Sequence, residues 1–497
     1  MNAHRTASGG RVDRGHTLRF TFDGAPFEGL AGDTLASALL ANGVHLVARS
    51  FKYHRPRGIL TAGAEEPNAL VTVRRDAARV TPNLRATQVE LYEGLAAESQ
   101  NRWPSLAFDL GRANDFLSPL FPAGFYYKTF MWPRAAWAAL YEPLIRRAAG
   151  LGRAPSEPDP DRYAQRYAHC DVLVVGAGPA GIAAAVAAAE CGARVVLCDE
   201  QAEPGGSLLD GPAASIDGET ADAWLTWCLS ELAGNPRVQL LPRTTAFGYF
   251  PHNNIGLVER ITDHRADAAP GAVRERLWQL RAREVVLATG AIEQPLVFPG
   301  NDRPGIMLAS AAHTYLHRYG VRAGNRAAIV TATDGAYRTA LDLRAAGVEI
   351  AAIVDQRPGS PMADPARQAG IEVILNATVA GTRGKLRVTG IELEGRTLAC
   401  DLVLMSGGWA PSVHLFSQSR GRLTWSDAAR AFVPSASAER ERSAGACRGV
   451  YGLAEALADG AAAGVAAAAA CGHAGKAPHM VVTGDEQAAM AAPAGAS

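Results

Sequence analysis

The stretch Cys170-Asp-Val-Leu-Val-Val-Gly-Ala-Gly-Pro-Ala-Gly181 decides the fold of this chain. Its β-branched half predicts a buried parallel strand over 171–175. Its glycines form a G-x-G-x-x-G turn, from which an alanine-rich helix runs to about Cys191. A second strand ends at Asp199 and Glu200, about 20 residues beyond the turn, where a dinucleotide-binding βαβ unit places its acid. The complete order of strand, turn, helix, strand and acid therefore predicts a dinucleotide site.

Each glycine of this turn has its own physical role. Gly176 permits the tight turn, Gly178 lets the backbone approach a pyrophosphate, and Gly181 lets the helix pack closely against the strand. The helix N-terminus offers N–H groups and a partial positive charge to the same pyrophosphate. Asp199 can accept hydrogen bonds from an adenosine ribose. The alternative is a glycine turn that only packs a helix on a strand.

The residues after this unit predict one nucleotide domain in two pieces, 169–300 and 396–471. Pro204-Gly-Gly206 follows the acid, as in flavoproteins built from two dinucleotide domains. A β-meander is predicted from Gly256 to about Leu280. The closing strand turns at Gly290, whose backbone we expect to lie near the cofactor.

Residues 301–395 predict a second nucleotide-like domain with a degenerate loop. Its turn is Thr331-Ala-Thr-Asp-Gly-Ala336, which carries side chains where a binding loop has glycines. A Cβ there blocks a pyrophosphate, so we expect that the site is lost. A closing helix is predicted from about Ala454 to Ala470, interrupted at Gly460, and residues 472–497 are expected to be disordered.

Residues 16–95 predict a small α+β domain with a ferredoxin-like order of elements. Asp33 is a plausible cap of its helix. This order resembles a domain that carries a two-iron cluster in several oxidoreductases, where cysteines follow a Pro-Arg-Gly element. The corresponding loop, 59–68, has no cysteine, so we expect a scaffold without metal. Arg55 and Arg57 contact either a phosphate or salt-bridge partners.

The connector 96–168 is rich in aromatic residues and proline. Three alternatives stay open for its rings: packing between the flanking domains, docking of another subunit, and stacking on a base or flavin. The aromatic residues are Trp103, Phe108, Phe116, Phe121, Phe125, Tyr126, Tyr127, Phe130, Trp132, Trp137 and Tyr141.

The composition excludes several functional classes. The 497 residues allow sizeable domain cores, and 49 basic residues balance 49 acidic ones, so we expect no nucleic-acid partner and no membrane partner. No apolar run reaches the roughly 18 residues of a spanning helix, and residues 1–15 are expected to form a flexible tail without a secretion signal. The seven cysteines include no C-x-x-C pair. Free thiols and a cytoplasmic location are therefore expected.

The predicted fold class is α/β: two Rossmann-like dinucleotide domains of the FAD/NAD(P)-binding type, with a parallel sheet and a β-meander, after the small ferredoxin-like domain. These pieces resemble the N-terminal half of the α subunit of heterotetrameric sarcosine oxidase over roughly residues 16–470. The similar phrases are Gly32–Ala41, Arg49–Gly58, Glu66–Leu70, Gln100–Ser105, Phe121–Pro133 and Asp199–Gln201.

The resemblance implies bound NAD in this chain, FAD in a β subunit that oxidises the amine, and FMN at the interface of the two. It implies further small subunits and a folate-binding domain or chain. Adjacent Asp199 and Glu200 would repel a 2′-phosphate, which favours NAD over NADP. By position, the residues implied to contact NAD are Ala180, Asp199, Glu200, Gln201, Ser207, Ala246, Gly445, Ala446, Tyr451 and Leu453.

The sequence leaves four possible functions for this chain. The first is an α-type subunit for oxidative demethylation of sarcosine to glycine, formaldehyde and hydrogen peroxide. The second is a subunit of an opine- or hydroxyproline-type dehydrogenase, and the third a stand-alone NADH-dependent flavoprotein reductase. The fourth is a structural subunit with inert NAD. The family subunit continues into a folate domain that this sequence lacks, so we expect a separate folate chain or a different amine.

No residue of this chain is predicted to be catalytic, and no metal site is predicted. Histidines such as His54, His252 and His313 are interpreted as surface or packing residues without metal-like spacing. The absence of C-x-x-C argues against a disulfide reductase.

Overall fold

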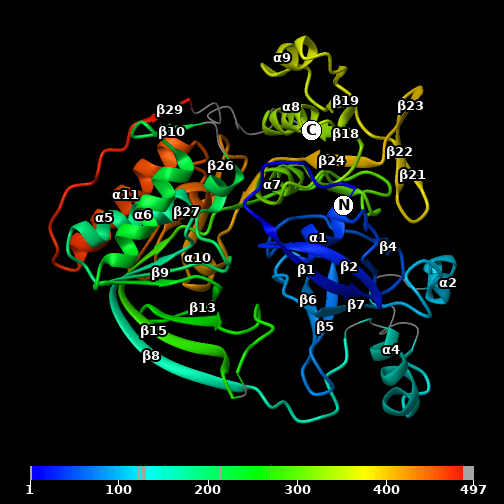
Figure 1. Ribbon diagram of the computed structural model, residues 1–497, viewed down its shortest axis with the longest axis horizontal. Coiled ribbons are helices and arrows are strands. Elements are labelled where there is room, and N and C mark those ends of the chain that lie inside the picture. The colour runs from blue at the N-terminus through cyan, green and yellow to red at the C-terminus, as the bar shows by residue number, and fades with distance from the viewer. Residues whose placement is uncertain are drawn as a thin grey trace. The chain divides into compact units, whose positions relative to one another are not determined.

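The computed structural model describes residues 3–484, apart from 121–123, 125–129, 149, 151, 212–213 and 270. The chain forms two compact units (Figure 1). One unit consists of Met1–Pro160, Leu296–Thr331 and Ala336–Met405, and the other of Asp161–Pro295, Ala332–Gly335 and Ser406–Ser497.

The first unit begins with the ferredoxin-like domain. Its mixed sheet has the order β2-β1-β7-β5-β6, in which β1 pairs antiparallel with β2 and parallel with β7. Thr34 caps α1 through a capping box with Ser37, whereas Asp33, the predicted cap, accepts a hydrogen bond from the Ser37 hydroxyl. The elements are β1 (Asp13–Phe22), β2 (Ala25–Ala31), α1 (Leu35–Ala41), β3 (Ala48–Arg49), β4 (Pro56–Arg57), β5 (Leu70–Arg74), β6 (Val80–Arg85) and β7 (Leu95–Ser99).

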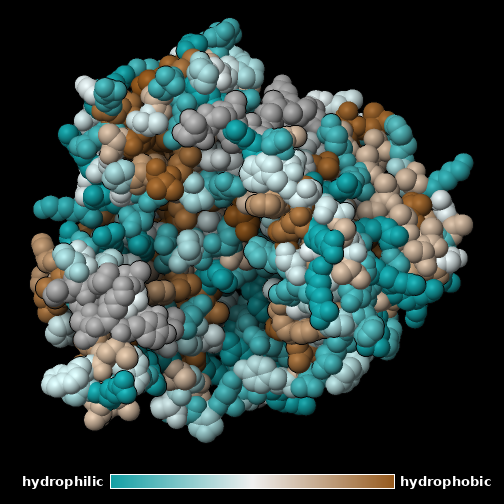
Figure 2. All heavy atoms as spheres, turned by 180° about the vertical axis from the view of Figure 1, so that it is seen from behind, coloured by the Kyte–Doolittle hydropathy of each residue, from teal (hydrophilic) through white to brown (hydrophobic). Residues whose placement is uncertain are grey.

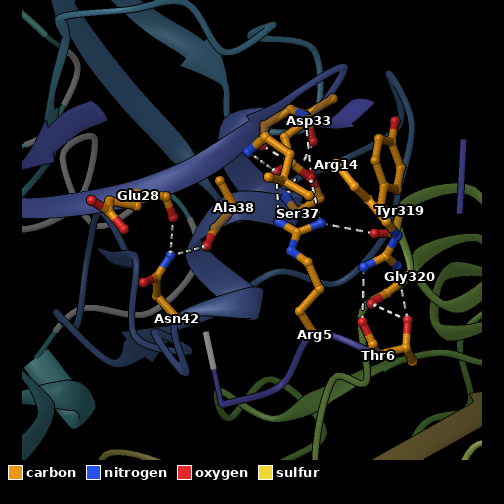
Figure 3. Close-up of polar contacts among 12 residues, drawn as sticks. Arg5, Thr6, Arg14, Glu28, Asp33, Ser37, Ala38, Asn42, Tyr319 and Gly320 are labelled. Carbon is orange, nitrogen blue, oxygen red and sulfur yellow. Dashed lines mark hydrogen bonds and ion pairs between the residues drawn. The ribbon is translucent and has the colours of Figure 1, made fainter. Parts of the chain in front are cut away.

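The N-terminal residues that precede this sheet are held in place rather than loose. Arg5 forms an ion pair of 2.6 Å with buried Asp33 and donates to the Tyr319 carbonyl (Figure 3). Thr6 donates its hydroxyl hydrogen to the Gly320 carbonyl. The predicted flexible tail over 1–15 is therefore anchored from about Arg5 onward, because a buried ion pair fixes it.

The second nucleotide-like domain completes the first unit. Its sheet has the order β17-β24-β18-β19-β20. Its last strand, β24, pairs parallel with β17, so the chain returns to the other unit at Ser406 rather than at the predicted residue 396. The elements are β17 (Ile306–Leu308), α7 (Ala309–Tyr319), β18 (Arg326–Thr331), α8 (Gly335–Ala345), β19 (Glu349–Asp355), α9 (Ala363–Gln368), β20 (Val373–Leu375), β21 (Gly381–Gly384), β22 (Val388–Leu393), β23 (Arg396–Ala399) and β24 (Leu402–Ser406).

The second unit is the first nucleotide domain. Its sheet has the order β12-β9-β8-β15-β14-β13, with β28 paired to β15. Neighbours of β8 are parallel, and β13, β14 and β15 form the predicted antiparallel meander. The elements are β8 (Arg162–Val175), α5 (Pro179–Glu190), β9 (Val195–Cys198), α6 (Ala221–Gly234), β12 (Val238–Leu241), β13 (Thr244–Phe250), β14 (Asn254–Arg260), β15 (Val273–Leu287), β28 (Glu441–Ser443) and α11 (Leu453–Ala470).

The β-branched run in β8 is buried on both faces, as a parallel strand requires. Val172 and Val174 join the core beneath α5 and α11, whereas Leu173 and Val175 join the core on the opposite face. The described part of the unit also contains short elements: η4 (Gly206–Asp210), β10 (Ser215–Ile216), β11 (Glu219–Thr220), β16 (Ala291–Glu293), β25 (Trp409–Pro411), α10 (His414–Gln418), β26 (Arg422–Ser426), β27 (Ala431–Ala436), η5 (Gly445–Arg448) and β29 (Val482–Thr483).

Helix α11 is continuous through Gly460, contrary to the predicted interruption. A Cβ at Gly460 would lie 2.1 Å from the Ala180 carbonyl oxygen, and one at Gly464 2.2 Å from that of Ala184. The two glycines therefore let α11 pack closely on α5. By length and composition α11 could also span a membrane, contrary to the expectation from the sequence; 44% of it is buried inside the protein, and core helices of similar length and composition meet the same criterion.

Two predicted loose segments have visible structure. Strand β29 pairs with β10, so the predicted disorder of 472–497 does not hold at Val482–Thr483; residues 485–497 lie outside the described residues. The connector contains η1 (Leu110–Arg112), α2 (Ala113–Phe116), η2 (Ser118–Leu120), η3 (Trp137–Tyr141) and α4 (Glu142–Ala148).

Candidate functional site: the dinucleotide cradle

The glycine turn after β8 is tightly packed on one side and open on the other. Gly176 has a φ of +99°, and a Cβ there would lie 2.3 Å from the Ala288 carbonyl oxygen. A Cβ at Gly181 would lie 1.8 Å from the Gly176 carbonyl oxygen. A Cβ at Gly178, in contrast, would have no atom within 4 Å. Two glycines therefore serve packing, and the third leaves a cradle that a side chain would fill.

Helix α5 starts directly behind this open position. Its N-cap is Gly178, no side chain caps it, and Pro179 occupies the first turn. Proline suits that position because it lacks the N–H that would need a partner. The uncapped N-terminus carries partial positive charge toward the cradle, as pyrophosphate binding requires.

Asp199 organises the loops around the cradle, a role that was not predicted from the sequence. Its Oδ2 accepts the Ala177 N–H at 2.6 Å, and its Oδ1 accepts the Gln201 N–H at 2.7 Å. The carboxylate thus ties the glycine turn to the loop after β9. A carboxylate oxygen has more than one lone pair, so the same group can also accept a hydrogen bond from a ribose hydroxyl when a nucleotide is bound.

The Pro-Gly-Gly loop lies against the same turn. The Gly205 N–H donates to the Ala177 carbonyl at 2.8 Å. A Cβ at Gly206 would lie 2.8 Å from Gly178 Cα. Ser207, which follows, is exposed. The glycine turn, which precedes Asp199 in the sequence, and the Pro-Gly-Gly loop, which follows it, therefore lie side by side.

Strand β13 carries Ala246, which is one of the predicted NAD contacts. The Thr244 N–H donates to the Asp199 carbonyl at 2.7 Å, which fixes the start of β13 beside the acid. Ala246 follows two residues later and is half-buried. Glu200, also half-buried, accepts a hydrogen bond from Arg260 through its carbonyl.

The closing turn before α11 reaches α5. A Cβ at Gly445 would lie 2.6 Å from the Ala180 Cβ, and the Gly445 N–H donates to Asp459 Oδ2 at 2.8 Å. Ala446 follows within η5 and is half-buried. The predicted residues Ala180 and Gly445 are therefore neighbours, although they lie far apart in the sequence.

Two further predicted contact residues, Gly290 and Tyr451, have surroundings that suit a polar ligand. Gly290 has a φ of +72°, and a Cβ there would have no atom within 4 Å. The Tyr451 hydroxyl is buried without a hydrogen-bond partner in the described part of the chain, and burial raises its pKa. Leaving a buried hydroxyl unpaired costs about 1–3 kcal/mol. Leu453, the first residue of α11, is buried.

The loop of the second nucleotide-like domain is filled by its own side chains. The Thr333 and Ser406 hydroxyls are 2.8 Å apart, and the Ala332 N–H donates to the Ser406 carbonyl. Thr333 is buried. The cradle of the first domain has no counterpart among these described residues.

The acid of the second domain is also occupied. Asp355, at the end of β19, is 0% exposed. It accepts the Tyr337 hydroxyl at 2.8 Å and the Arg357 guanidinium at 2.8 and 3.0 Å. The degenerate loop was predicted from the sequence, whereas this network was not.

The cysteine-free loop of the ferredoxin-like domain is organised by a buried carboxylate. Thr61, Glu66 and Ala69 have the C-x₄-C-x₂-C spacing of plant-type cluster ligands. Glu66 accepts the N–H groups of Thr61 and Ala69 at 2.7 and 3.0 Å, and those of Leu60 and Asn68 at 2.8 Å each. Burial raises its pKa, against the opposing effect of these four N–H groups. The loop is thus closed by protein hydrogen bonds.

The basic pair before this loop forms salt bridges. Arg55 pairs with Asp115 at 3.1 Å, and Arg57 pairs with Asp302. These contacts favour the salt-bridge alternative over a phosphate contact.

The aromatic residues of the connector are largely exposed. Phe116 is 85% and Trp132 is 84% exposed, and Trp103 and Phe108 are also exposed. Phe121, Phe125, Tyr126 and Tyr127 lie outside the described residues. On the face drawn in Figure 2, hydrophobic residues form small groups among hydrophilic ones. Exposed rings favour docking of a partner over packing within the chain.

Comparison with known proteins defines the class to which this site belongs. A family model described as pyridine nucleotide-disulphide oxidoreductase matches residues 170–433, and one described as a 2Fe-2S iron-sulfur cluster binding domain matches residues 15–102. The chain belongs to the pyridine nucleotide-disulphide oxidoreductase family. The predicted fold class is confirmed.

Among individual proteins, the chain is similar to the alpha chain of sarcosine oxidase. It is 53% identical to that of Rhizobium meliloti (strain 1021), over 93% of this chain and 47% of the relative, and 40% identical to that of Corynebacterium sp. (strain P-1), over 93% and 44%. The chain thus spans about half the length of these curated relatives. The predicted resemblance is confirmed.

More distant matches support the fold. An opine oxidase component from Agrobacterium tumefaciens (strain Ach5) is 29% identical over 53% of this chain and 57% of the relative. The crystal structure of L-proline dehydrogenase from P. horikoshii superposes with a TM-score of 0.65 at 18% identity, covering 96% of this chain and 77% of that chain. The latter likeness concerns the fold alone.

Proposed function

We propose that this chain is the nucleotide-binding part of an α-type subunit in a flavin-dependent amine oxidase that oxidises sarcosine. The single observation that supports it most is the 53% identity to the alpha chain of a sarcosine oxidase, which extends over 93% of the chain. In the proposed reaction, sarcosine, water and oxygen give glycine, formaldehyde and hydrogen peroxide.

The dinucleotide in the cradle is proposed to be NAD. The open positions at Gly178 and Gly290 and the unpaired Tyr451 hydroxyl fit a nucleotide with polar groups at both ends. Asp199 and Glu200 would accept hydrogen bonds from a free ribose and repel a 2′-phosphate. When bound, NAD can supply hydride chemistry; in this chain it can equally serve to stabilise the fold.

The amine-oxidising flavin is proposed to lie on a partner. A β subunit would carry FAD, and FMN would lie at its interface with this chain, with further small subunits and a folate-binding domain or chain in the complex. The exposed connector rings supply a surface of the composition found at subunit interfaces. A cytoplasmic location fits the seven free cysteines.

The second nucleotide-like domain is proposed to have lost its site. Its loop is filled by Thr333 and its acid is paired with Arg357. This argues against the stand-alone NADH-dependent reductase, which needs two working sites. The opine oxidase alternative has support only from relatives at 29% identity or less.

The test uses the purified full chain and then the complex. Nucleotide released from the chain alone should be NAD by mass, and the protein should be colourless. Bound FAD instead would support the reductase alternative. The chain co-expressed with its neighbouring reading frames should produce hydrogen peroxide and formaldehyde from sarcosine. Turnover of an opine without turnover of sarcosine would contradict the proposed substrate.

A further inference from the structure

Two histidines and an aspartate converge within the second nucleotide-like domain. His313 and His317 lie one turn apart on α7, and Asp342 comes from α8. The Nε2 atoms of the histidines lie 3.1 and 3.2 Å from the same oxygen, Asp342 Oδ2. The sequence interpretation of His313 as a packing residue overlooked its i,i+4 spacing to His317.

Two of the three distances between these atoms match an edge of a metal coordination sphere. A tetrahedron with bonds of about 2.0 Å to nitrogen and oxygen has edges of about 3.3 Å. The two nitrogen–oxygen distances fall close to that edge, and all three potential ligand atoms lie within 4.8 Å of one another. Binding of a cation would bring the two imidazole nitrogens to about the same edge distance through rotation of the His313 and His317 side chains.

The ligand types and their exposure favour a borderline transition metal. Imidazole and carboxylate ligands together suit Zn²⁺ and its neighbours more than Mg²⁺ or Ca²⁺, which prefer oxygen alone. The side chains of His313, His317 and Asp342 are 18%, 29% and 29% exposed, so an ion can reach them from solvent. Three protein ligands leave one position for water.

The Asp342 carboxylate has the negative charge that a ligand of a cation needs. Burial acts to raise the pKa of Asp342, but hydrogen bonds from the two histidines outweigh it and hold that pKa well below the usual range. The carboxylate therefore stays ionised, as a metal ligand must. The competing explanation is that this cluster is only a His–Asp–His ion-pair arrangement that needs no metal.

We propose that His313, His317 and Asp342 form a binding site for one divalent cation of the zinc class, which ties α7 to α8. The site is separate from the dinucleotide cradle, and the proposal does not depend on the proposed amine oxidation.

The experiment titrates the full chain, stripped with a chelator, with Co²⁺ and then with Zn²⁺. Co²⁺ should give the intense visible absorption of a tetrahedral site at one equivalent, and Zn²⁺ should abolish it. In His317→Ala, and in the size-preserving His317→Gln, the Zn²⁺ affinity should fall at least ten-fold, since even loss of an outer-shell partner costs about 10–100-fold.

Two matched variants separate this site from adventitious binding. His414→Ala removes an exposed histidine of α10, and Cys191→Ser removes a half-buried thiol. Both should bind Zn²⁺ as the wild type does, and circular dichroism should show that every variant is folded. Equal affinity in His317→Gln and the wild type, loss of binding in Cys191→Ser, or no tetrahedral spectrum would each overturn the proposal.

Discussion

The two βαβ loops of this chain have the same order of elements, but one loop is open whereas the other is filled by its own side chains. After β8, Gly178 faces open space and Asp199, which is half-buried, accepts two backbone N–H groups. After β18, Thr333 occupies the corresponding place, and Asp355 is buried against Arg357 and Tyr337. The difference teaches that a nucleotide loop can keep its fold after its ligand is replaced by side chains.

The ferredoxin-like loop extends this lesson. There too a place used by a bound group in related domains is closed from within, by the Glu66 carboxylate and four N–H donors. Loops that have lost a ligand should therefore depend on their own polar contacts for stability. The stability of the open loop should instead depend less on such contacts, and changes there should mainly affect ligand binding.

The largest effect is expected at the filled loop. Asp355→Ala removes the carboxylate that pairs with the buried Arg357 guanidinium, and breaking a buried pair in this way costs about 3–5 kcal/mol. Denaturant unfolding of the full chain measures it. Asp364→Ala, which removes an exposed ion pair with Arg367, is the control and should cost under about 1 kcal/mol. Equal costs would show that the Asp355 network does not hold the filled loop.

A smaller effect is expected from adding a methyl group to the packed side of the open loop. Gly181→Ala places a Cβ 1.8 Å from the Gly176 carbonyl oxygen, so the free energy of unfolding should fall by about 3 kcal/mol. The second loop has Ala336 at the matching place, and Ala336→Gly should cost only about 1 kcal/mol. Equal magnitudes would mean that the two helices do not approach their strands differently.

Replacing Glu66 tests the third loop and its pH dependence. Glu66→Gln loses one acceptor oxygen and should lower the free energy of unfolding by about 2 kcal/mol at pH 7. Because the pKa of Glu66 is raised above 4.5, the folded state binds this proton more tightly than the unfolded state. The contribution of this proton to stability is present below pH 4.5 and is lost as the pH rises through the folded-state pKa. The difference between wild type and variant should therefore shrink with rising pH over that window; a difference that grows would contradict the assigned shift.

The smallest effect on stability is expected at Asp199. Asp199→Asn keeps one acceptor for the Ala177 or Gln201 N–H and should cost about 1 kcal/mol of stability. NAD affinity should fall by about ten-fold, because charged hydrogen bonds to the ribose weaken. Calorimetric titration measures the affinity, and Asp222→Asn, on the exposed side of α6, is the control. An unchanged affinity would remove Asp199 from the ribose site.

The sequence alone predicted the parts of the fold in which a residue type is required for a single physical reason. The glycine turn, the β-branched strand and the loop 331–336 predicted the fold, because each depends on backbone space and burial pattern. The hydrogen-bond and ion-pair partners of individual side chains could not be predicted in the same way. The Asp199 bonds to backbone N–H groups, and the Asp355–Arg357 pair, join residues whose spacing has no periodic signature.

The predicted limits of the last helix and of the N-terminal tail were wrong for a related reason. The predicted break at Gly460 followed the low helix propensity of glycine, but close packing on Ala180 overrides it. Likewise, nothing in residues 1–15 alone indicates that Arg5 will meet Asp33. Such features appear only when distant segments come together.

The measurement that tests the central claim most directly is the nucleotide content of Gly178→Val. Because a Cβ at Gly178 meets no protein atom, the variant should fold with wild-type stability and yet lose NAD binding at least a hundred-fold. Gly234→Val, at another glycine with open space around it, should retain NAD. A folded Gly178→Val protein that purifies with a full equivalent of NAD would contradict the account.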